Sequence, residues 1–136
     1  MDEALVRLAW RRAHDRCEYC QMPRALSFLP HEIDHLIARK HHGKRVRSNL
    51  ALTCAYDNGF KGPNIAGLDP NTGSLVRLFH PRRHKWHRHF RWAGPVLIGR
   101  TAIGRATIDV LAMNHPLRIE QRRALIGAGL FPPANV

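Results

Sequence analysis

Apolar residues recur with the period of an amphipathic helix near both ends of the chain. Residues 2–14 predict a first helix, whose acidic start suits the positive N-terminal end of the helix dipole. Residues 101–114 predict a second helix, which Thr101 caps. Residues 115–129 predict a last helix, which has a proline in its first turn and ends at a glycine.

Between these helices the apolar runs are shorter and are typical of strands. Residues 25–38 predict two short strands separated by Pro30, and residues 89–94 and 95–99 predict two more. The Asp, Pro, Asn and Gly of residues 69–73 are typical of a tight turn or hairpin. Helices and short strands are therefore both expected.

Polar and apolar residues alternate less regularly between residues 39 and 62. Residues 39–48 are too basic and polar for a core and predict a surface loop. Residues 49–52 predict a short capped turn, and residues 54–62 predict a helix that Gly62 ends. The loop and the helix lie close in sequence to the residues with the most distinctive chemistry.

Length and composition predict a single globular domain. The chain has 136 residues, of which 44% are hydrophobic, and no apolar run approaches the roughly 20 residues that span a bilayer. The first residues are acidic and lack the apolar region of a signal peptide. We therefore expect a cytoplasmic protein without a membrane partner.

The charge balance favours a polyanionic partner. The formal net charge is +12 with neutral histidines, which exceeds the magnitude of about 2–8 that suits solubility in a small domain. Basic side chains bind a phosphate backbone and release its counterions. Nucleic acid is therefore the expected partner.

The three cysteines do not form a disulfide framework, because their number is odd and the chain is expected in the cytoplasm. Cys17 and Cys20 have the C-x-x-C spacing of metal ligands, and Cys54 stands alone. This set would supply three of the four thiolates of a zinc site.

The pair Asp34 and His35 allows three interpretations: a hydrogen-bonded core pair, half of a metal site, or the centre of an active site. Phosphodiester hydrolysis needs a base, which a histidine can supply, and a cation held by hard oxygen ligands. Neighbouring side chains on a strand point to opposite faces, so a site that uses both residues requires the strand to end or bulge there. The helix that follows could bring Asn58 towards the pair.

The segments "CEYC", "EIDHLIARKHHG" and "SNLALTCAYDNGFKG" together resemble an HNH endonuclease of the ββα-metal type. The shared order is D-H, then an asparagine after a loop, then an asparagine on a helix before K-G. The resemblance implies an α+β fold with a ββα-metal core at about residues 14–64 and an N-terminal helix. A C-terminal extension of strands and helices, about residues 65–136, would complete a single HNH nuclease domain of residues 1–136.

The resemblance also implies roles for individual residues. His35 would be the general base, and Asp34 and Asn58 would hold a divalent metal, Mg²⁺ or Mn²⁺. Asn49 would be a catalytic residue that orients the loop and the base. Lys61 would contact a phosphate or serve a structural role. The expected activity is metal-dependent endonucleolytic hydrolysis of DNA phosphodiester bonds, most simply in double-stranded DNA.

Members of this family often hold a structural Zn²⁺ between two C-x-x-C pairs. The first pair is complete in Cys17 and Cys20, whereas Asp57 follows Cys54 where a second cysteine is expected. A Cys₃Asp zinc site is chemically possible, although a carboxylate is a harder ligand than a thiolate. The alternative is three buried apolar thiols, with Asp57 in a hydrogen bond or a helix cap.

Basic and aromatic residues interleave in "FHPRRHKWHRHFRW", residues 79–92, as in a nucleic-acid-binding face. The spacing of Trp86, Phe90 and Trp92 equally favours aromatic residues in the core, with the charges on the opposite face. The expected phosphate contacts are Arg82, Arg83, Lys85, Arg88 and Arg91.

Two other functions compete with a DNA endonuclease. One is a non-catalytic zinc-knuckle DNA-binding protein whose nuclease site has degenerated. The other is an HNH nuclease that acts on RNA. The intact Asp34, His35 and Asn58 argue against the first, and the replaced cysteine at position 57 argues mildly for it.

Overall fold

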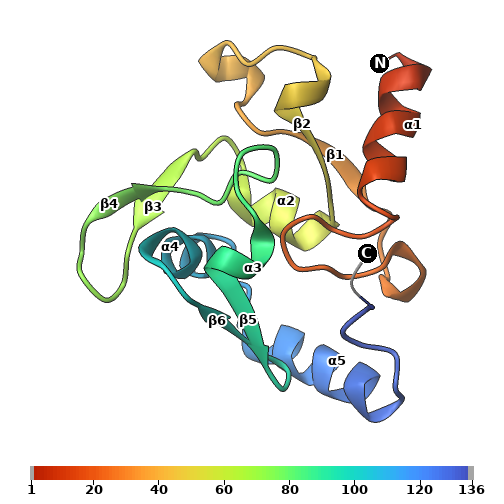
Figure 1. Cartoon of the computed structure of the whole chain (residues 1–136), viewed down its shortest axis with the longest axis vertical. Helices are drawn as coiled ribbons and strands as arrows, with labels where there is room; N and C mark the ends of the chain where they lie inside the picture. Colours follow the sequence, from red (N-terminus) through yellow and green to blue (C-terminus); the bar gives the residue numbers. More distant parts are fainter. Residues whose placement is uncertain (1, 135–136) are drawn as a thin grey trace.

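A two-stranded antiparallel sheet followed by a short helix lies at the middle of the N-terminal half of the chain (Figure 1). The computed structural model describes residues 2–134. Helix α1 (Glu3–Arg12) comes first, strands β1 (Glu32–His35) and β2 (Leu50–Thr53) pair with each other, and α2 (Ala55–Lys61) follows β2. This order of elements is the ββα arrangement that the resemblance to HNH endonucleases implies.

Local sequence explains where these elements begin and end. Asp2 caps α1, because its side chain accepts a hydrogen bond from the Ala4 amide. Cys54 caps α2 through its sulfur, and Gly62 ends that helix with a positive φ of 50°. All four residues of β2 are buried, whereas Asp34 is the buried residue of β1 and Glu32, on the same strand, is exposed.

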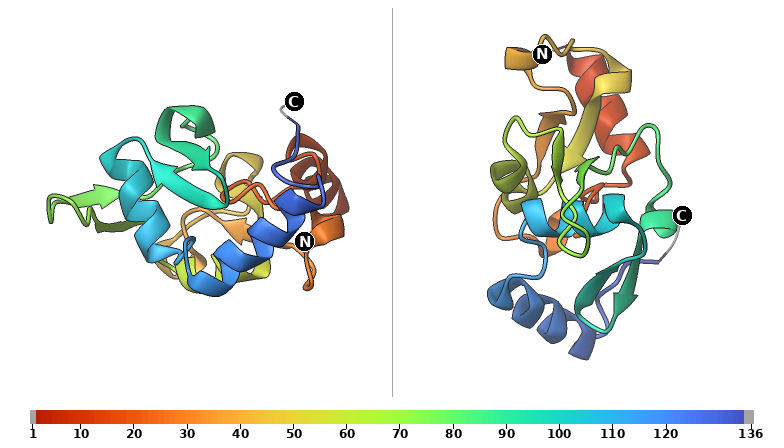
Figure 2. Two further views of the ribbon diagram at one scale, coloured as in Figure 1. Left: turned by 90° about the horizontal axis from the view of Figure 1, so that it is seen from below. Right: turned by 90° about the vertical axis from the view of Figure 1, so that its left-hand side faces the viewer.

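The C-terminal half contains two further hairpins and three helices (Figure 1). Strands β3 (Ala66–Leu68) and β4 (Leu75–Arg77) form a hairpin that extends away from the other elements in both figures (Figures 1 and 2). The short helix α3 (Trp86–His89) leads into the hairpin of β5 (Phe90–Ala93) and β6 (Val96–Gly99). Helix α4 (Ala102–Val110) packs against both hairpins, and α5 (Pro116–Gly127) follows it.

One hydrophobic core joins the two halves of the chain. Buried residues of the ββα segment and of the C-terminal extension belong to the same cluster. Its members include Cys17, Tyr19, Cys20, Leu36, Ala51 and Cys54 from the first half and Leu78, Phe79, Phe90, Leu97, Leu111, Met113 and Phe131 from the second. The extension therefore packs directly on the segment that carries the candidate site.

The α+β fold class and the helices expected near the two ends are confirmed. The tight turn at residues 69–73 connects β3 to β4, as expected, and the loop of residues 39–48 lies at the surface. No helix among residues 2–134 is both long and apolar enough to cross a membrane.

Three local predictions are wrong. The first half of residues 25–38 forms a 3₁₀ turn at Arg24–Leu26, and Phe28 is 94% exposed, so no buried face is available for a strand there. Residues 49–52 do not form a turn, because Leu50–Thr53 is the buried partner strand of β1. Residues 86–89 are helical, so the strand spacing that places Trp86 in line with Phe90 and Trp92 does not apply.

Candidate active site and metal centre

Adjacent residues of α2 contribute to two different side-chain clusters. Asp57 is fully buried among the three cysteines. Asn58 is partly exposed and its Nδ2 donates a hydrogen bond to the Glu32 Oε2 on β1, at 2.6 Å. The seven-residue helix α2 thus contributes to two clusters. We call the buried cysteines with Asp57 the closed cluster, and the residues around Asp34 and Asn58 the more open cluster.

Asp34 is buried on β1 and is held by a buried cation. Its Oδ2 is 3.0 Å from the Nζ of Lys61, and the Tyr19 hydroxyl lies 3.5 Å from the same oxygen. Burial raises the pKa of Asp34, and the Lys61 ammonium opposes that rise. Among residues 2–134, both contacts of this carboxylate go to Oδ2, which leaves Oδ1 available for a cation.

Lys61 is itself 2% exposed. Besides the Asp34 carboxylate, its Nζ donates to the backbone carbonyl oxygens of His35 at 3.4 Å and Leu36 at 3.3 Å. All three acceptors of the Lys61 ammonium lie in β1 or directly after it. Of the two roles expected for Lys61, the structure favours the structural one over a phosphate contact.

His35 is the last residue of β1, so the strand ends where a site that uses both Asp34 and His35 requires it. The imidazole is partly exposed, and its Nε2 is buried without a hydrogen-bond partner among residues 2–134. Burial, and then the charges of Arg39 and Arg45, lower the pKa of His35. This shift favours the neutral imidazole, which is the form in which a histidine acts as a general base.

Asn49 fixes the loop that follows His35. Its Oδ1 accepts a hydrogen bond from the Ile37 amide at 2.9 Å, and its Nδ2 donates to the carbonyl oxygens of Ile37 and Lys44 at 3.0 and 2.9 Å. In the same loop, a Cβ at Gly43 would collide with the Ile37 carbonyl oxygen. These contacts are those of a residue that orients the loop rather than one that binds metal.

Glu32 is a further candidate site residue, which the sequence patterns did not indicate. It lies two positions before Asp34 on the same strand, and its carboxylate accepts the Asn58 amide hydrogen bond. This bond turns the Asn58 nitrogen towards Glu32, which leaves Oδ1 free as a possible metal ligand. The period of two along a strand could have indicated it, because Glu32 and Asp34 share a face.

The donors around this more open cluster suit a hard divalent cation. Asp34 and Asn58 offer carboxylate and amide oxygens from β1 and α2, two elements that pack against each other. Mg²⁺ and Mn²⁺ prefer such oxygen ligands. The donor atoms of Asp34 and Asn58 are therefore of the type that a hard divalent ion prefers.

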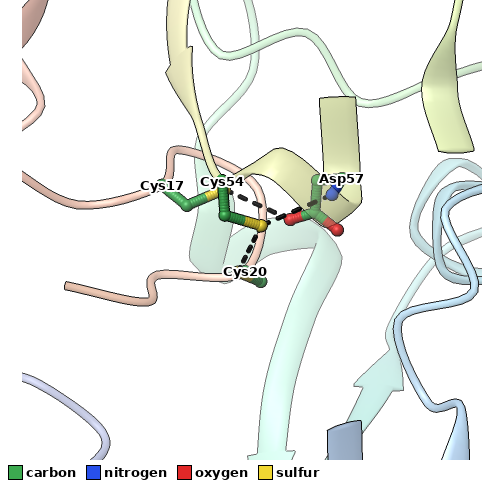
Figure 3. A group of neighbouring side chains, drawn as sticks. All are labelled: Cys17, Cys20, Cys54 and Asp57. Carbon is green, nitrogen blue, oxygen red and sulfur yellow. Dashed lines mark hydrogen bonds between the residues drawn. The ribbon is translucent and has the colours of Figure 1, made fainter. Parts of the chain in front are cut away.

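The closed cluster combines Cys17, Cys20, Cys54 and Asp57, whose ligand atoms all lie within 4.8 Å of one another (Figure 3). The sulfurs of Cys20 and Cys54 are 3.7 Å apart, and Cys17 Sγ is 3.2 Å from the Asp57 Oδ2. Zinc–sulfur bonds of about 2.3 Å in a tetrahedron place sulfurs roughly 3.8 Å apart, so the spacing fits zinc. All three cysteines are free thiols.

The electrostatics of this cluster also favour a cation. Burial raises the pKa of the Cys17 thiol. Burial, followed by the neighbouring Cys20, raises the pKa of Asp57 to about 7. Several acidic groups in a closed, buried space oppose one another's ionisation unless a positive charge is among them. The Cys17 thiol and the Arg118 guanidinium each contact the Asp57 carboxylate, so this buried group has partners within the protein as well.

The basic residues of 79–92 lie in two environments. Arg82 forms an ion pair with Glu18, and its side chain is only 17% exposed, so its charge is largely neutralised within the protein. Phe90 is buried and Trp86 and Trp92 are partly buried, which supports the core interpretation for the aromatic residues. The exposed basic side chains of this segment are Arg83, Lys85, Arg88 and Arg91.

A second group of exposed cations lies directly after His35. Arg39 and Arg45 belong to it and are close enough to affect the pKa of His35. The sequence predicts a surface loop here, and its cations were not among the predicted nucleic-acid contacts. The exposed basic side chains of the loop are Arg39, Lys40, Lys44, Arg45 and Arg47.

An antiparallel strand pair and a helix, with an Asp-His pair at the end of the first strand, define the ββα-metal class of nuclease folds. Residues 17–63 match the family of HNH endonucleases, and this segment of the chain is an HNH domain. At the level of the family, that domain supports nuclease activity on nucleic acid with divalent metal ions. No curated protein and no solved structure matched the chain.

Proposed function

We propose that this protein is a metal-dependent endonuclease that hydrolyses phosphodiester bonds in double-stranded DNA. The observation that carries the proposal is the position of His35. His35 ends β1 directly after Asp34 and before an exposed basic loop, and burial followed by nearby cations lowers its pKa. A neutral base, a carboxylate and phosphate-binding cations are the groups that this hydrolysis needs.

In this proposal Asp34 and Asn58 hold Mg²⁺ or Mn²⁺. The bound ion would stabilise negative charge on the scissile phosphate and the leaving oxygen. Lys61 positions Asp34 by holding its Oδ2, and Glu32 positions Asn58 by accepting its amide N–H. Both contacts leave the remaining oxygen of each ligand free for the ion.

His35 accepts a proton from the attacking water in this mechanism. The low pKa of His35 leaves its imidazole unprotonated at neutral pH, and Asn49 keeps the following loop in place. The proton on the imidazole then exchanges with solvent, because the side chain is partly exposed. The neutral base is restored for the next turnover.

The exposed cations of the loop after His35 are the nearest phosphate contacts to the base. Arg83, Lys85 and Arg88 would extend this contact along the DNA. Arg82 would contribute less, since Glu18 already pairs with it. Because contacts of this kind release counterions, binding should weaken steeply as salt rises.

We further propose that Cys17, Cys20, Cys54 and Asp57 hold a structural Zn²⁺. Its role would be to join the turn after α1 to the start of α2. Residues 1–136 would then form a single domain, with a catalytic core at about residues 14–64 and an accessory extension. The cytoplasmic location stays a prediction from the sequence.

The proposed activity is tested by incubating the purified protein with plasmid DNA and with single- and double-stranded RNA in parallel, each with Mg²⁺, with Mn²⁺ and with EDTA. We expect metal-dependent cleavage of the plasmid and slower or no cleavage of RNA. Binding to DNA without cleavage under any metal condition would contradict an enzyme and favour a DNA-binding protein. Faster cleavage of RNA would overturn the DNA assignment alone.

A further inference from the structure

The Asp57 carboxylate has a separate partner for each of its two oxygens. Oδ2 accepts from the Cys17 thiol at 3.2 Å and faces the thiol cluster. Oδ1 lies 2.9 Å from Nη2 of Arg118, a residue of α5. Asp57 is fully buried and Arg118 is 8% exposed, so this ion pair is shielded from solvent.

Arg118 also donates a hydrogen bond to the backbone at the end of α4. Its Nη1 donates to the Leu111 carbonyl oxygen at 3.1 Å, and its guanidinium lies 5.9 Å from the centre of the Tyr56 ring. One side chain therefore connects α5, the residue that follows α4, and α2. Breaking a buried pair of this kind leaves an uncompensated charge in the interior.

A cysteine at position 57 could not make the same connection. A thiolate offers one sulfur, whereas a carboxylate can direct one oxygen to a metal ion and the other to a guanidinium. Three thiolates and a carboxylate also carry more negative charge than a divalent ion neutralises, and Arg118 offsets part of the excess. Partners of metal ligands orient those ligands and change metal affinity.

We propose that Asp57 bridges the metal ion and Arg118, so that metal binding in the Cys₃Asp site is coupled to the docking of α5 on the HNH segment. Arg118 is a positioning residue for the ligand Asp57. The replacement of the expected cysteine by aspartate creates this connection rather than weakening the site alone. The inference rests on the proposed structural zinc and is independent of the proposed cleavage reaction.

The test uses the full chain under reducing conditions, with zinc affinity measured by chelator competition and protection of α5 measured by hydrogen exchange. In the wild type, removal of zinc should raise amide exchange in α5 at least tenfold. Arg118→Met should weaken zinc binding by about 10–100-fold, the range for partners of metal ligands. It should also raise α5 exchange while zinc is still bound.

Arg122→Met is the matched control. Arg122 is also buried on the same helix but donates to the carbonyl oxygens of Pro95 and Met113 rather than to a proposed metal ligand. This variant should loosen α5 and leave zinc affinity within about twofold of the wild type, since it does not touch a ligand. Equal zinc affinities of Arg118→Met and Arg122→Met would overturn the coupling.

Asp57→Cys separates the bridge from the metal site, because it restores four thiolates and removes the partner of Arg118. We expect this variant to bind zinc and to exchange its α5 amides as fast as zinc-loaded Arg118→Met. In the Asp57→Cys background, Arg118→Met should have little further effect on zinc affinity. Wild-type protection of α5 in zinc-loaded Asp57→Cys would overturn the inference.

Zinc binding by the wild-type protein tests this inference separately from the nuclease proposal. A wild-type protein that binds no zinc when reduced would overturn both the structural zinc and the coupling. Plasmid cleavage would stand or fall on its own measurement.

Discussion

Two sites share the short helix α2 and differ in how completely the protein surrounds them. The Asp57 site is closed, because all four of its side chains are buried and supplied by the protein. The Asp34–Asn58 site is more open, since Asn58 and His35 are only partly buried. Structural metal sites are typically closed, whereas catalytic sites keep a position for water or substrate. Neighbouring residues on one helix can therefore serve stability and chemistry separately.

The two sites also differ in how they manage negative charge. At the more open site, Lys61 already neutralises much of Asp34. At the closed site, Arg118 from the C-terminal extension pairs with Asp57, and this single positive charge lies beside four acidic groups. The proposed zinc would supply the positive charge that Arg118 alone does not provide at the closed site.

Cys17→Ser should give the largest effect, because it removes a ligand from the closed site. We expect a loss of roughly 5 kcal/mol or more of unfolding free energy, as for other losses of a metal ligand in a small domain. Urea denaturation with zinc present measures it. Asn58→Ala is the contrasting variant and should abolish cleavage while retaining zinc and stability; loss of zinc in Asn58→Ala would show that the two sites are not separate.

Lys61→Met should give the second-largest effect, a loss of unfolding free energy at the more open site. It leaves the buried Asp34 carboxylate without its cation, which costs about 3–5 kcal/mol when one partner of a buried pair is removed. Thermal or urea unfolding tests this. Exposed Lys40 offers a control, and Lys40→Met should change stability by less than about 0.5 kcal/mol. A neutral effect of Lys61→Met would indicate a surface role for the ammonium after all.

Glu32→Ala should affect the more open site without affecting the fold. Glu32 is exposed, so its loss removes the orientation of Asn58 rather than core packing. We expect the Mg²⁺ or Mn²⁺ concentration for half-maximal cleavage to rise about 10-fold or more. Glu32→Gln keeps an oxygen acceptor for Asn58 and should lie closer to the wild type. An unchanged metal requirement in Glu32→Ala would remove Glu32 from the site.

The smallest effect concerns the extension and depends on pH. Asp69 receives two hydrogen bonds from Arg105 of α4, which lower the pKa of this carboxyl. A carboxyl with a lowered folded-state pKa contributes stability above its ordinary pKa of about 4, and the contribution disappears as pH falls below that value. The stability difference between the wild type and Asp69→Asn should therefore be constant near neutral pH and shrink below about pH 4 in urea titrations. A difference that grows with acidity would contradict this sign.

The motif residues were predictable from sequence because their order and spacing are local. The helix of Asp57 and Asn58 follows from a cap at Cys54 and a glycine at position 62. The strand β2 was mistaken for a turn, since its residues are buried on both faces and show no alternation. Arg118 could not be assigned in advance, because its contact with Asp57 is set by tertiary packing between the last helix and α2.

His35 carries the central claim, and the most direct measurement compares His35→Ala with His41→Ala in a plasmid cleavage assay with Mg²⁺. His41 is an exposed histidine of the basic loop after His35, so it controls for loss of imidazole and local charge. We predict that His35→Ala lowers the cleavage rate by about 10²–10⁴-fold, the usual contribution of a general base. His41→Ala should cleave within a few-fold of the wild type, and both variants should retain zinc and the wild-type melting temperature. Equal cleavage rates for His35→Ala and the wild type would contradict His35 as the base.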